Sequence, residues 1–151
     1  MTLQKKDYGF VALQIILFVL YLWDFDLFEF ELSFYQRASA LSIAFIGMIV
    51  VAIAIIQLNT KISPFPTPRA NSELIIYGLY RYSRHPIYTG ILLTCAGYAF
   101  YSNSIYKLII TTLLYVLFYF KSNYEEQQLM QKFPSYRSYK NRTGRFFPKR
   151  L

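Results

Sequence analysis

The sequence predicts an all-α, polytopic integral membrane protein with about four transmembrane helices. Of its 151 residues, 55% are hydrophobic and 20% are aromatic, which exceeds the usual share in soluble proteins. The 16 basic and 8 acidic residues lie almost entirely between or beyond four apolar stretches. No stretch alternates with the period of a strand, and a helix satisfies all its own backbone groups inside a bilayer. These observations together favour membrane-spanning helices.

The first two apolar stretches make up an N-terminal half, residues 1–60. The first covers Gly9 to Trp23, or reaches as far as Phe28, and the second covers Ala38 to Leu58. The second is long enough to cross a bilayer, which takes about 20 residues. Lys5-Lys6 before the first stretch resembles the start of a secretory signal, but the small residues at 38–40 lie beyond an acidic, aromatic segment. We therefore expect a membrane anchor rather than a cleaved signal.

The third and fourth apolar stretches, Ile87 to Tyr101 and Ile105 to Phe120, are shorter. Only Ser102-Asn103-Ser104 separates them, so the sequence predicts a tight helical hairpin in the C-terminal half, residues 61–151. Small residues recur at helical spacing on the second and third stretches, which favours close helix packing in a membrane. The residues on these two small faces are Ala40, Ala44, Gly47, Val51 and Ala54, and Gly90, Thr94 and Gly97.

The distribution of charge predicts the orientation in the membrane. The loop after the first stretch is mainly acidic, whereas the loop after the second and the long tail after the fourth are strongly basic. Basic loops stay in the cytoplasm, so we expect both termini to face it. The same rule accounts for the net charge of +8 without a nucleic-acid partner. We expect one domain over residues 1–151.

Polar residues gather at the predicted start of the third helix. Pro86 suits a first helical position, which places His85 at the helix mouth and Tyr88 one turn further. Free N–H groups at a helix start favour a carboxylate or phosphate. Arginine, histidine and tyrosine also anchor helix ends at a membrane surface. Both interpretations are open on this pattern alone.

An acidic pair, Glu125-Glu126, follows the fourth stretch, and Lys121 lies four residues before Glu125 on the same helical face. The pair could bind a cationic ligand, or Lys121 and Glu125 could form an exposed ion pair worth only about 0.3–0.5 kcal/mol. Phe133-Pro134 predicts the end of this helix. One histidine and one cysteine offer no set of metal ligands, so we expect no metal site.

Several strings in these segments resemble the isoprenylcysteine carboxyl methyltransferase and phospholipid methyltransferase superfamily of integral membrane enzymes. The matching strings are Gly78-Leu79-Tyr80, Arg84-His85-Pro86-Ile87-Tyr88-Thr89-Gly90, Glu125-Glu126-Gln127-Gln128-Leu129, Phe133-Pro134-Ser135-Tyr136 and Thr143-Gly144-Arg145-Phe146-Phe147-Pro148. They cover roughly the C-terminal half of the chain.

The resemblance implies S-adenosylmethionine (SAM) as the cofactor and assigns roles to single residues. The positions that it implies for SAM binding are Ser72, Glu73, Leu74, Ile75, Tyr80, His85, Pro86, Ile87, Tyr88 and Glu125. Lys121 falls where the eukaryotic isoprenylcysteine enzymes have a substrate-binding arginine. Lysine is a point charge and lacks the two-pronged fork of arginine, so the acceptor can differ.

The expected reaction moves a methyl group to a lipid-like or prenylated acceptor at the cytoplasmic membrane face. The acceptor atom can belong to a carboxylate, an amine or a hydrophobic thiol. A carboxylate needs no base, whereas an amine or thiol must lose a proton, for which Glu126 or His85 is the candidate catalytic residue. The alternatives are an NADPH-dependent membrane reductase of a related fold and a non-catalytic membrane scaffold. The short chain leaves little room for a dinucleotide.

Overall fold

The computed structural model describes residues 4–23, 25, 30–58, 65–67 and 73–149. Over these residues the regular structure is entirely helical, with a single isolated bridge between Ser83 and Gly144 in place of any strand. The all-α fold class is therefore confirmed for the described part of the chain. The elements are α1 (Lys5–Leu22), α2 (Phe34–Leu58), the 3-10 helix η2 (Gly78–Arg81), α3 (Pro86–Tyr101), α4 (Ile105–Lys132) and α5 (Tyr136–Arg142).

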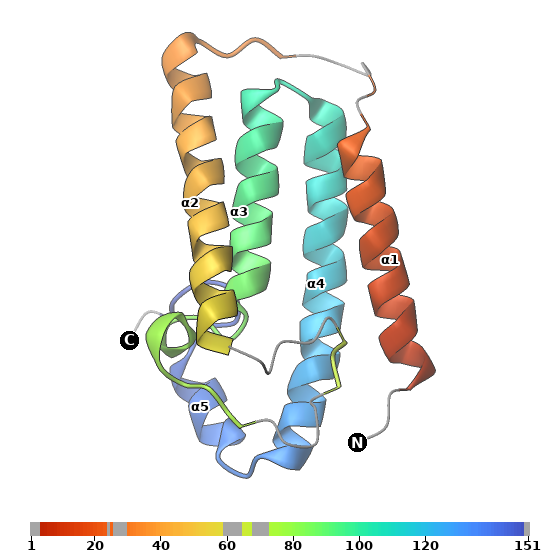
Figure 1. The fold of residues 1–151 in the computed structure, drawn as a ribbon, viewed down its shortest axis with the longest axis vertical. Coiled ribbons are helices and arrows are strands. Elements are labelled where there is room, and N and C mark those ends of the chain that lie inside the picture. The colour runs from red at the N-terminus through yellow and green to blue at the C-terminus, as the bar shows by residue number, and fades with distance from the viewer. Residues whose placement is uncertain (1–3, 24, 26–29, 59–64, 68–72, 150–151) are drawn as a thin grey trace.

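The four long helices form a bundle in which α2 packs on α3, α3 on α4, and α4 on α1 (Figure 1). The first turn of α1 and the short helix α5 lie at the same end of this bundle (Figure 1). The start of α3 lies at that end as well, so the segments that carry the sequence motifs converge there.

Two of the helices are long and apolar enough to cross a membrane, namely α2 with 25 residues and α4 with 28. Helix α3 has 16 residues and is about 24 Å long, less than the roughly 30 Å of a hydrocarbon core. The expectation of about four spans is thus met for two helices. Large apolar side chains are nevertheless exposed along the bundle, as lipid contact requires; examples are Ile15, Ile16, Phe45, Ile56, Ile109 and Leu113.

Helices α2 and α3 approach each other through the small faces that the sequence predicts. A Cβ atom on Gly47 would lie 2.5 Å from the backbone nitrogen of Thr94, and one on Gly97 would lie 2.5 Å from the backbone nitrogen of Ala44. Real Cβ atoms do not approach backbone so closely, so these positions exclude larger residues. This close contact replaces the hydrophobic driving force that is missing between helices in lipid.

The connection between α3 and α4 is the predicted hairpin. Asn103 adopts a left-handed backbone conformation (φ 54°), which asparagine tolerates better than most residues. The Ser104 side chain then accepts a hydrogen bond from the backbone N–H of Lys107 and caps α4. Helix α4 continues past the apolar stretch to Lys132 and ends before Pro134, as the sequence predicts.

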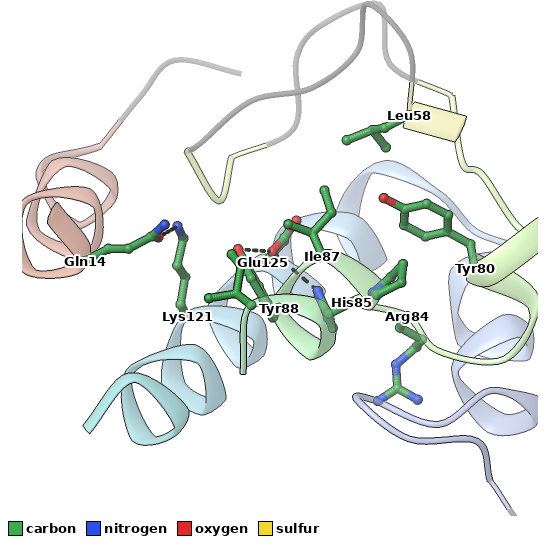
Figure 2. A pocket seen from close by; sticks show the side chains of 11 residues that line it. Gln14, Leu58, Tyr80, Arg84, His85, Ile87, Tyr88, Lys121 and Glu125 are labelled. Carbon is green, nitrogen blue, oxygen red and sulfur yellow. Dashed lines mark hydrogen bonds and ion pairs between the residues drawn. The ribbon is translucent and has the colours of Figure 1, made fainter. Parts of the chain in front are cut away.

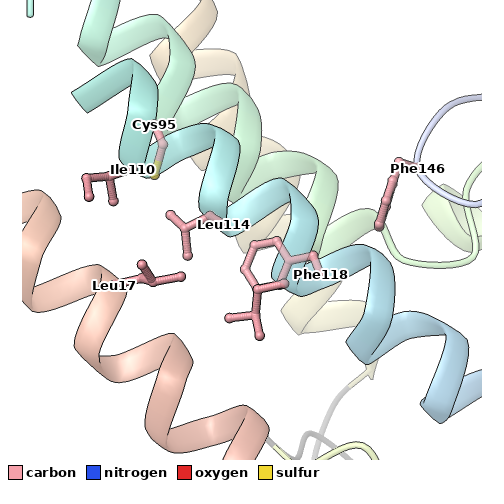
Figure 3. Close-up of a cluster of buried hydrophobic side chains, with 7 residues drawn as sticks. Leu17, Cys95, Ile110, Leu114, Phe118 and Phe146 are labelled. Carbon is pink, nitrogen blue, oxygen red and sulfur yellow. The ribbon is translucent and has the colours of Figure 1, made fainter. Parts of the chain in front are cut away.

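Helix α1 joins the bundle through apolar packing and through its first turn. Leu17 packs with residues of α3 and α4 in the core shown in Figure 3, where Leu114 and Phe118 are fully buried. At the start of the helix, the buried Asp7 carboxylate accepts hydrogen bonds from the backbone N–H of Gln4 at 2.6 Å and from the Thr67 hydroxyl at 2.9 Å. The apolar packing thus holds α1 against α4, and the Thr67 contact ties the first turn of α1 to residues 65–67.

Candidate functional site

The end of α2 fixes the turn before α3. The Gln57 side-chain oxygen accepts a hydrogen bond from the Leu79 backbone N–H at 2.9 Å. Gly78 has φ 60°, a left-handed conformation that favours glycine, and a Cβ atom there would also displace the Gln57 amide. The following Tyr80 is buried, with its hydroxyl 3.5 Å from the Ala54 carbonyl oxygen. The Gly78-Leu79-Tyr80 string is therefore held against α2.

The C-terminal tail pairs with the segment that leads into α3. The Arg84 backbone N–H donates to the Gly144 carbonyl at 2.9 Å, and the His85 N–H donates to the Arg145 carbonyl at 3.1 Å. Pro86 then begins α3, where its missing N–H costs nothing. Two strings that are far apart in the sequence thus come together around His85.

A cavity of about 300 Å³ lies between the beginning of α3, the C-terminal half of α4 and helix α1 (Figure 2). This volume is at the lower end of the range for small-molecule sites. Seven of its lining residues are sequence-predicted site residues: Tyr80, His85, Pro86, Ile87, Tyr88, Lys121 and Glu125. The cavity is completed by Gln14, Leu58, Arg84 and Ile91.

Glu125 forms the acidic end of the cavity. The Tyr88 hydroxyl donates to the Glu125 carboxylate at 3.1 Å, and the His85 Nδ1 atom lies 3.6 Å from the same oxygen. The His85 ring stacks on the Tyr88 ring, which stacks in turn on Phe118 with ring centres 4.5 Å apart. The carboxylate is thus supported on an aromatic wall and presents negative charge to the cavity.

Glu126 occupies a different position, behind the cavity wall. Its side chain is 1% exposed, and its carboxylate lies 2.8 Å from Arg84 Nε and 2.9 Å from Lys140 Nζ. Arg145 Nε is 3.8 Å away, and His85 Nε2 is 3.3 Å away. His85 therefore bridges the two glutamates, one through each ring nitrogen. Glu126 ties α4 to both the segment before α3 and the tail, rather than facing a ligand.

Lys121, one helical turn before Glu125 on α4, forms with Gln14 the basic end of the cavity (Figure 2). Its ammonium donates a hydrogen bond to the Gln14 side-chain oxygen at 2.6 Å and lies 5.5 Å from the centre of the Tyr88 ring. The Lys121 side chain is buried. The interpretation of Lys121 and Glu125 as an ordinary exposed ion pair is therefore wrong, because the side chain of Lys121 is not exposed to solvent.

Two tyrosines support the site from outside the membrane-crossing helices. The Tyr139 hydroxyl donates to the Tyr80 carbonyl at 2.5 Å and links α5 to η2. Burial raises the pKa of Tyr80 above its ordinary value, with a further contribution from the negative charge of Glu125. Burial likewise raises the pKa of Tyr139. Both hydroxyls therefore keep their protons at neutral pH and act as donors.

The structure does not bring Glu73, Leu74 or Ile75 of the predicted stretch into this cavity. Ser72 lies outside the described residues. Leu74 lines a separate cavity of about 560 Å³ beside α5, and Glu73 is exposed. Ile75 is half-buried and lines neither cavity.

Sequence reasoning missed Gln14 and Arg84 as site residues. Arg84 stood within the Arg84–Gly90 string, so its position was available. Gln14 is the one amide within the apolar stretch from Gly9 to Trp23, and a polar side chain inside an apolar helix is a recognisable signal of function.

Comparison with known families decides the class of protein. The family model described as phospholipid methyltransferase matches residues 35–137. The chain belongs to the phospholipid methyltransferase family. A comparison with curated proteins found no match. The resemblance that the sequence motifs indicate is therefore confirmed, and membership implies a membrane-bound methyltransferase.

The match covers α2, η2, α3, α4 and the first residues of α5. It thus includes the acidic end of the cavity and Lys121. Helix α1, with Gln14, lies outside the matched range, and so do the tail residues that pair with Arg84 and His85. The place of Gln14 and of the tail in the site therefore rests on the structure of this chain and not on the family match.

Proposed function

We propose that the protein is a single-domain integral membrane enzyme that uses SAM to methylate a lipid-like or prenylated acceptor at the cytoplasmic membrane face. One observation carries the proposal: a single cavity is lined by both the carboxylate of Glu125 and the ammonium of Lys121, which lie one helical turn apart on α4. Such a cavity can accept a cationic donor and an acceptor side by side. Family membership supplies the reaction class.

The acidic end of the cavity suits SAM. The carboxylate of Glu125 complements the positively charged sulfonium and ammonium groups of this cofactor, and the aromatic wall behind it excludes water. When bound, SAM would supply an electrophilic methyl group. Tyr80, His85, Tyr88 and Glu125 would hold it, and their task is to orient it and to keep water away from it.

An apolar groove supports a lipid-like acceptor. This third cavity, of about 460 Å³, is almost wholly apolar and shares the residue Ile91 with the candidate site. Its other lining residues come from α1, α2 and α3: Phe18, Met48, Val51, Ala52, Ile55, Thr94 and Cys95. An acceptor with an apolar tail could lie here and reach the site from the bilayer.

The need for a base depends on the acceptor atom. A carboxylate is ionised at neutral pH, so orientation and exclusion of water suffice. An amine or thiol must lose a proton, and His85, which lines the cavity, is better placed to take it than Glu126: in the neutral tautomer that donates from Nε2 to Glu126, Nδ1 remains an acceptor. Arg84 and Lys140 hold Glu126 as a carboxylate, which makes it a weak base. We assign to Glu126 the orientation of the His85 ring.

The proposal includes the membrane topology. With both termini in the cytoplasm, all four long helices would cross the bilayer, and the shorter α1 and α3 would be covered partly by α4 and α2. The motif-bearing end of the bundle (Figure 1) would then lie at the cytoplasmic surface, where SAM is available. The basic loops of the sequence support this orientation.

Two experiments test the function. In calorimetry on detergent-purified protein, SAM and its demethylated product should both bind. If neither binds at millimolar concentration, the proposal is wrong. Labelled methyl from SAM should then appear in a prenylated cysteine, a phosphatidylethanolamine or a hydrophobic thiol. Oxidation of NADPH without methyl transfer would favour the reductase instead.

A further inference from the structure

A side-chain pair closes the basic end of the candidate site. Gln14 of α1 and Lys121 of α4 both line the cavity and point toward each other (Figure 2). The Lys121 ammonium lies 2.6 Å from the Gln14 side-chain oxygen. The two residues are 107 positions apart, so this contact is created only when α1 packs on α4.

The chemistry of the pair fixes the orientation of the amide. A lysine ammonium has three donors and no acceptor, so the oxygen of Gln14 must face it. The NH₂ group of Gln14 therefore points away from Lys121. The cavity wall at this end thus offers an ammonium and an amide N–H next to each other, which are both donors.

We propose that Gln14 and Lys121 together bind an oxyanion of the methyl acceptor, either a carboxylate or a phosphodiester; this inference rests on the function proposed above. A lone ammonium is a point charge without directional preference. An adjacent amide donor held by that ammonium adds a second, fixed hydrogen bond, as in a two-donor fork. The pair thereby supplies a directionality that lysine alone lacks.

The rest of the cavity fits this assignment. Glu125, one helical turn from Lys121, would repel an anion and so favours its binding on the side of Lys121 that Gln14 occupies. The apolar groove begins at Ile91, which lines both cavities, so a tail attached to the anion has a place to lie. An amide within an apolar membrane helix is costly and marks function more often than packing. Gln14 therefore selects the acceptor, not the cofactor.

The test measures binding of matched probes to the full-length protein in detergent by calorimetry, so it does not depend on turnover. The carboxylate probe is N-acetyl-S-farnesylcysteine, and its neutral carboxamide has the same tail. Dihexanoylphosphatidylethanolamine is the phosphodiester probe. Wild-type protein should bind one of the two oxyanion probes and bind the carboxamide more weakly; whichever oxyanion probe binds identifies the source.

Two variants of Gln14 then separate anion binding from simple packing. Gln14→Glu places a carboxylate against Lys121 and should lower the affinity for the oxyanion probe roughly tenfold or more. This is the effect of losing a hydrogen bond to a charged group. Gln14→Met keeps the length of the side chain but removes both polar atoms, and should lower the affinity for the oxyanion probe to a smaller extent. Neither variant should change the affinity for SAM or for the carboxamide. Gln131→Glu adds the same charge at an exposed position of α4 and is the matched control.

The outcomes are decisive in both directions. If Gln14→Glu does not fold, judged by loss of SAM binding, Gln14→Met decides. Oxyanion affinity unchanged in the variants that fold, or equal loss for the oxyanion and the carboxamide, would overturn the inference. Wild-type protein that binds SAM but prefers no oxyanion overturns it too. Wild-type protein that fails to bind SAM contradicts the proposed function instead, so the two failures are distinguishable.

Discussion

Two adjacent glutamates of α4 have different surroundings: one faces the candidate cavity and the other is buried among basic side chains. The Glu125 carboxylate faces the cavity with Tyr88 and His85, whereas the Glu126 carboxylate lies behind it between Arg84 and Lys140. Successive residues of a helix point about 100° apart, so one can face a ligand and the next the protein. Their replacements should therefore fail in different measurements.

Glu125→Gln should weaken SAM binding without unfolding the protein. The substitution keeps the shape of the side chain but removes the charge that would meet SAM in the proposed site. Loss of a charge-assisted hydrogen bond costs about 1.5–3 kcal/mol, or roughly ten- to a hundredfold in affinity. Calorimetric titration of SAM measures the effect, and thermal unfolding is the control. Wild-type affinity in this variant would refute the assignment of Glu125 to the cofactor.

Glu126→Gln should instead lower stability. The change leaves the buried Arg84, together with Lys140 and Arg145, without a counter-charge, and removal of one partner of a buried ion pair costs about 3–5 kcal/mol. We expect a lower Tm and protease cleavage in the released tail. Gln127→Glu, at an exposed neighbouring position, is the control for a change of charge on α4. A Tm equal to that of the wild type would contradict the structural role.

At the scale of the helices, the contact between α2 and α3 holds the site together, because α2 supports η2 and α3 carries His85. Gly47→Ala should destabilise the protein by about 1–3 kcal/mol, the usual cost of overpacking. Its new Cβ would lie 2.5 Å from the backbone of Thr94, which cannot move aside. Gly9→Ala in α1 is the matched control, since a Cβ there meets nothing within 4 Å. Chemical unfolding in mixed micelles measures both, and equal stability would contradict the packing.

The same elements show what the sequence can and cannot predict. Helical periodicity and hydropathy predict α2, the hairpin and the small faces, since these depend on residues close in sequence. The helix η2 and the paired tail depend instead on contacts such as Gln57 with Leu79 and Gly144 with Arg84. The pair of Gln14 and Lys121 likewise arises from the packing of α1 on α4. No local pattern encodes such long-range partners, so the residues of the acidic end were predicted and the contribution of α1 was not.

In the whole molecule the candidate cavity adjoins the apolar groove, and under the proposed function the acceptor and the cofactor would arrive by these separate routes. Ile91 is common to the cavity and the apolar groove. A bulky residue at a groove position that does not line the candidate cavity should therefore obstruct the acceptor and leave the cofactor site intact. Ala52 lines the groove, whereas Ile56, four residues later on α2, is 74% exposed and lines neither cavity.

Ala52→Trp should raise the acceptor's KM about tenfold or more, because the indole fills space that an apolar tail would occupy and each buried CH₂ of such a tail contributes about 0.8 kcal/mol. The KM for SAM should not change. Ile56→Trp places the same indole on the lipid-facing side of α2 and should leave both constants unchanged. Steady-state kinetics with labelled SAM and a long-chain acceptor provide the measurement, and a short-chain acceptor should be affected less in Ala52→Trp. If the two variants behave alike, or if a water-soluble acceptor without a tail is methylated as well as a lipid, then the acceptor does not reach the site through the groove.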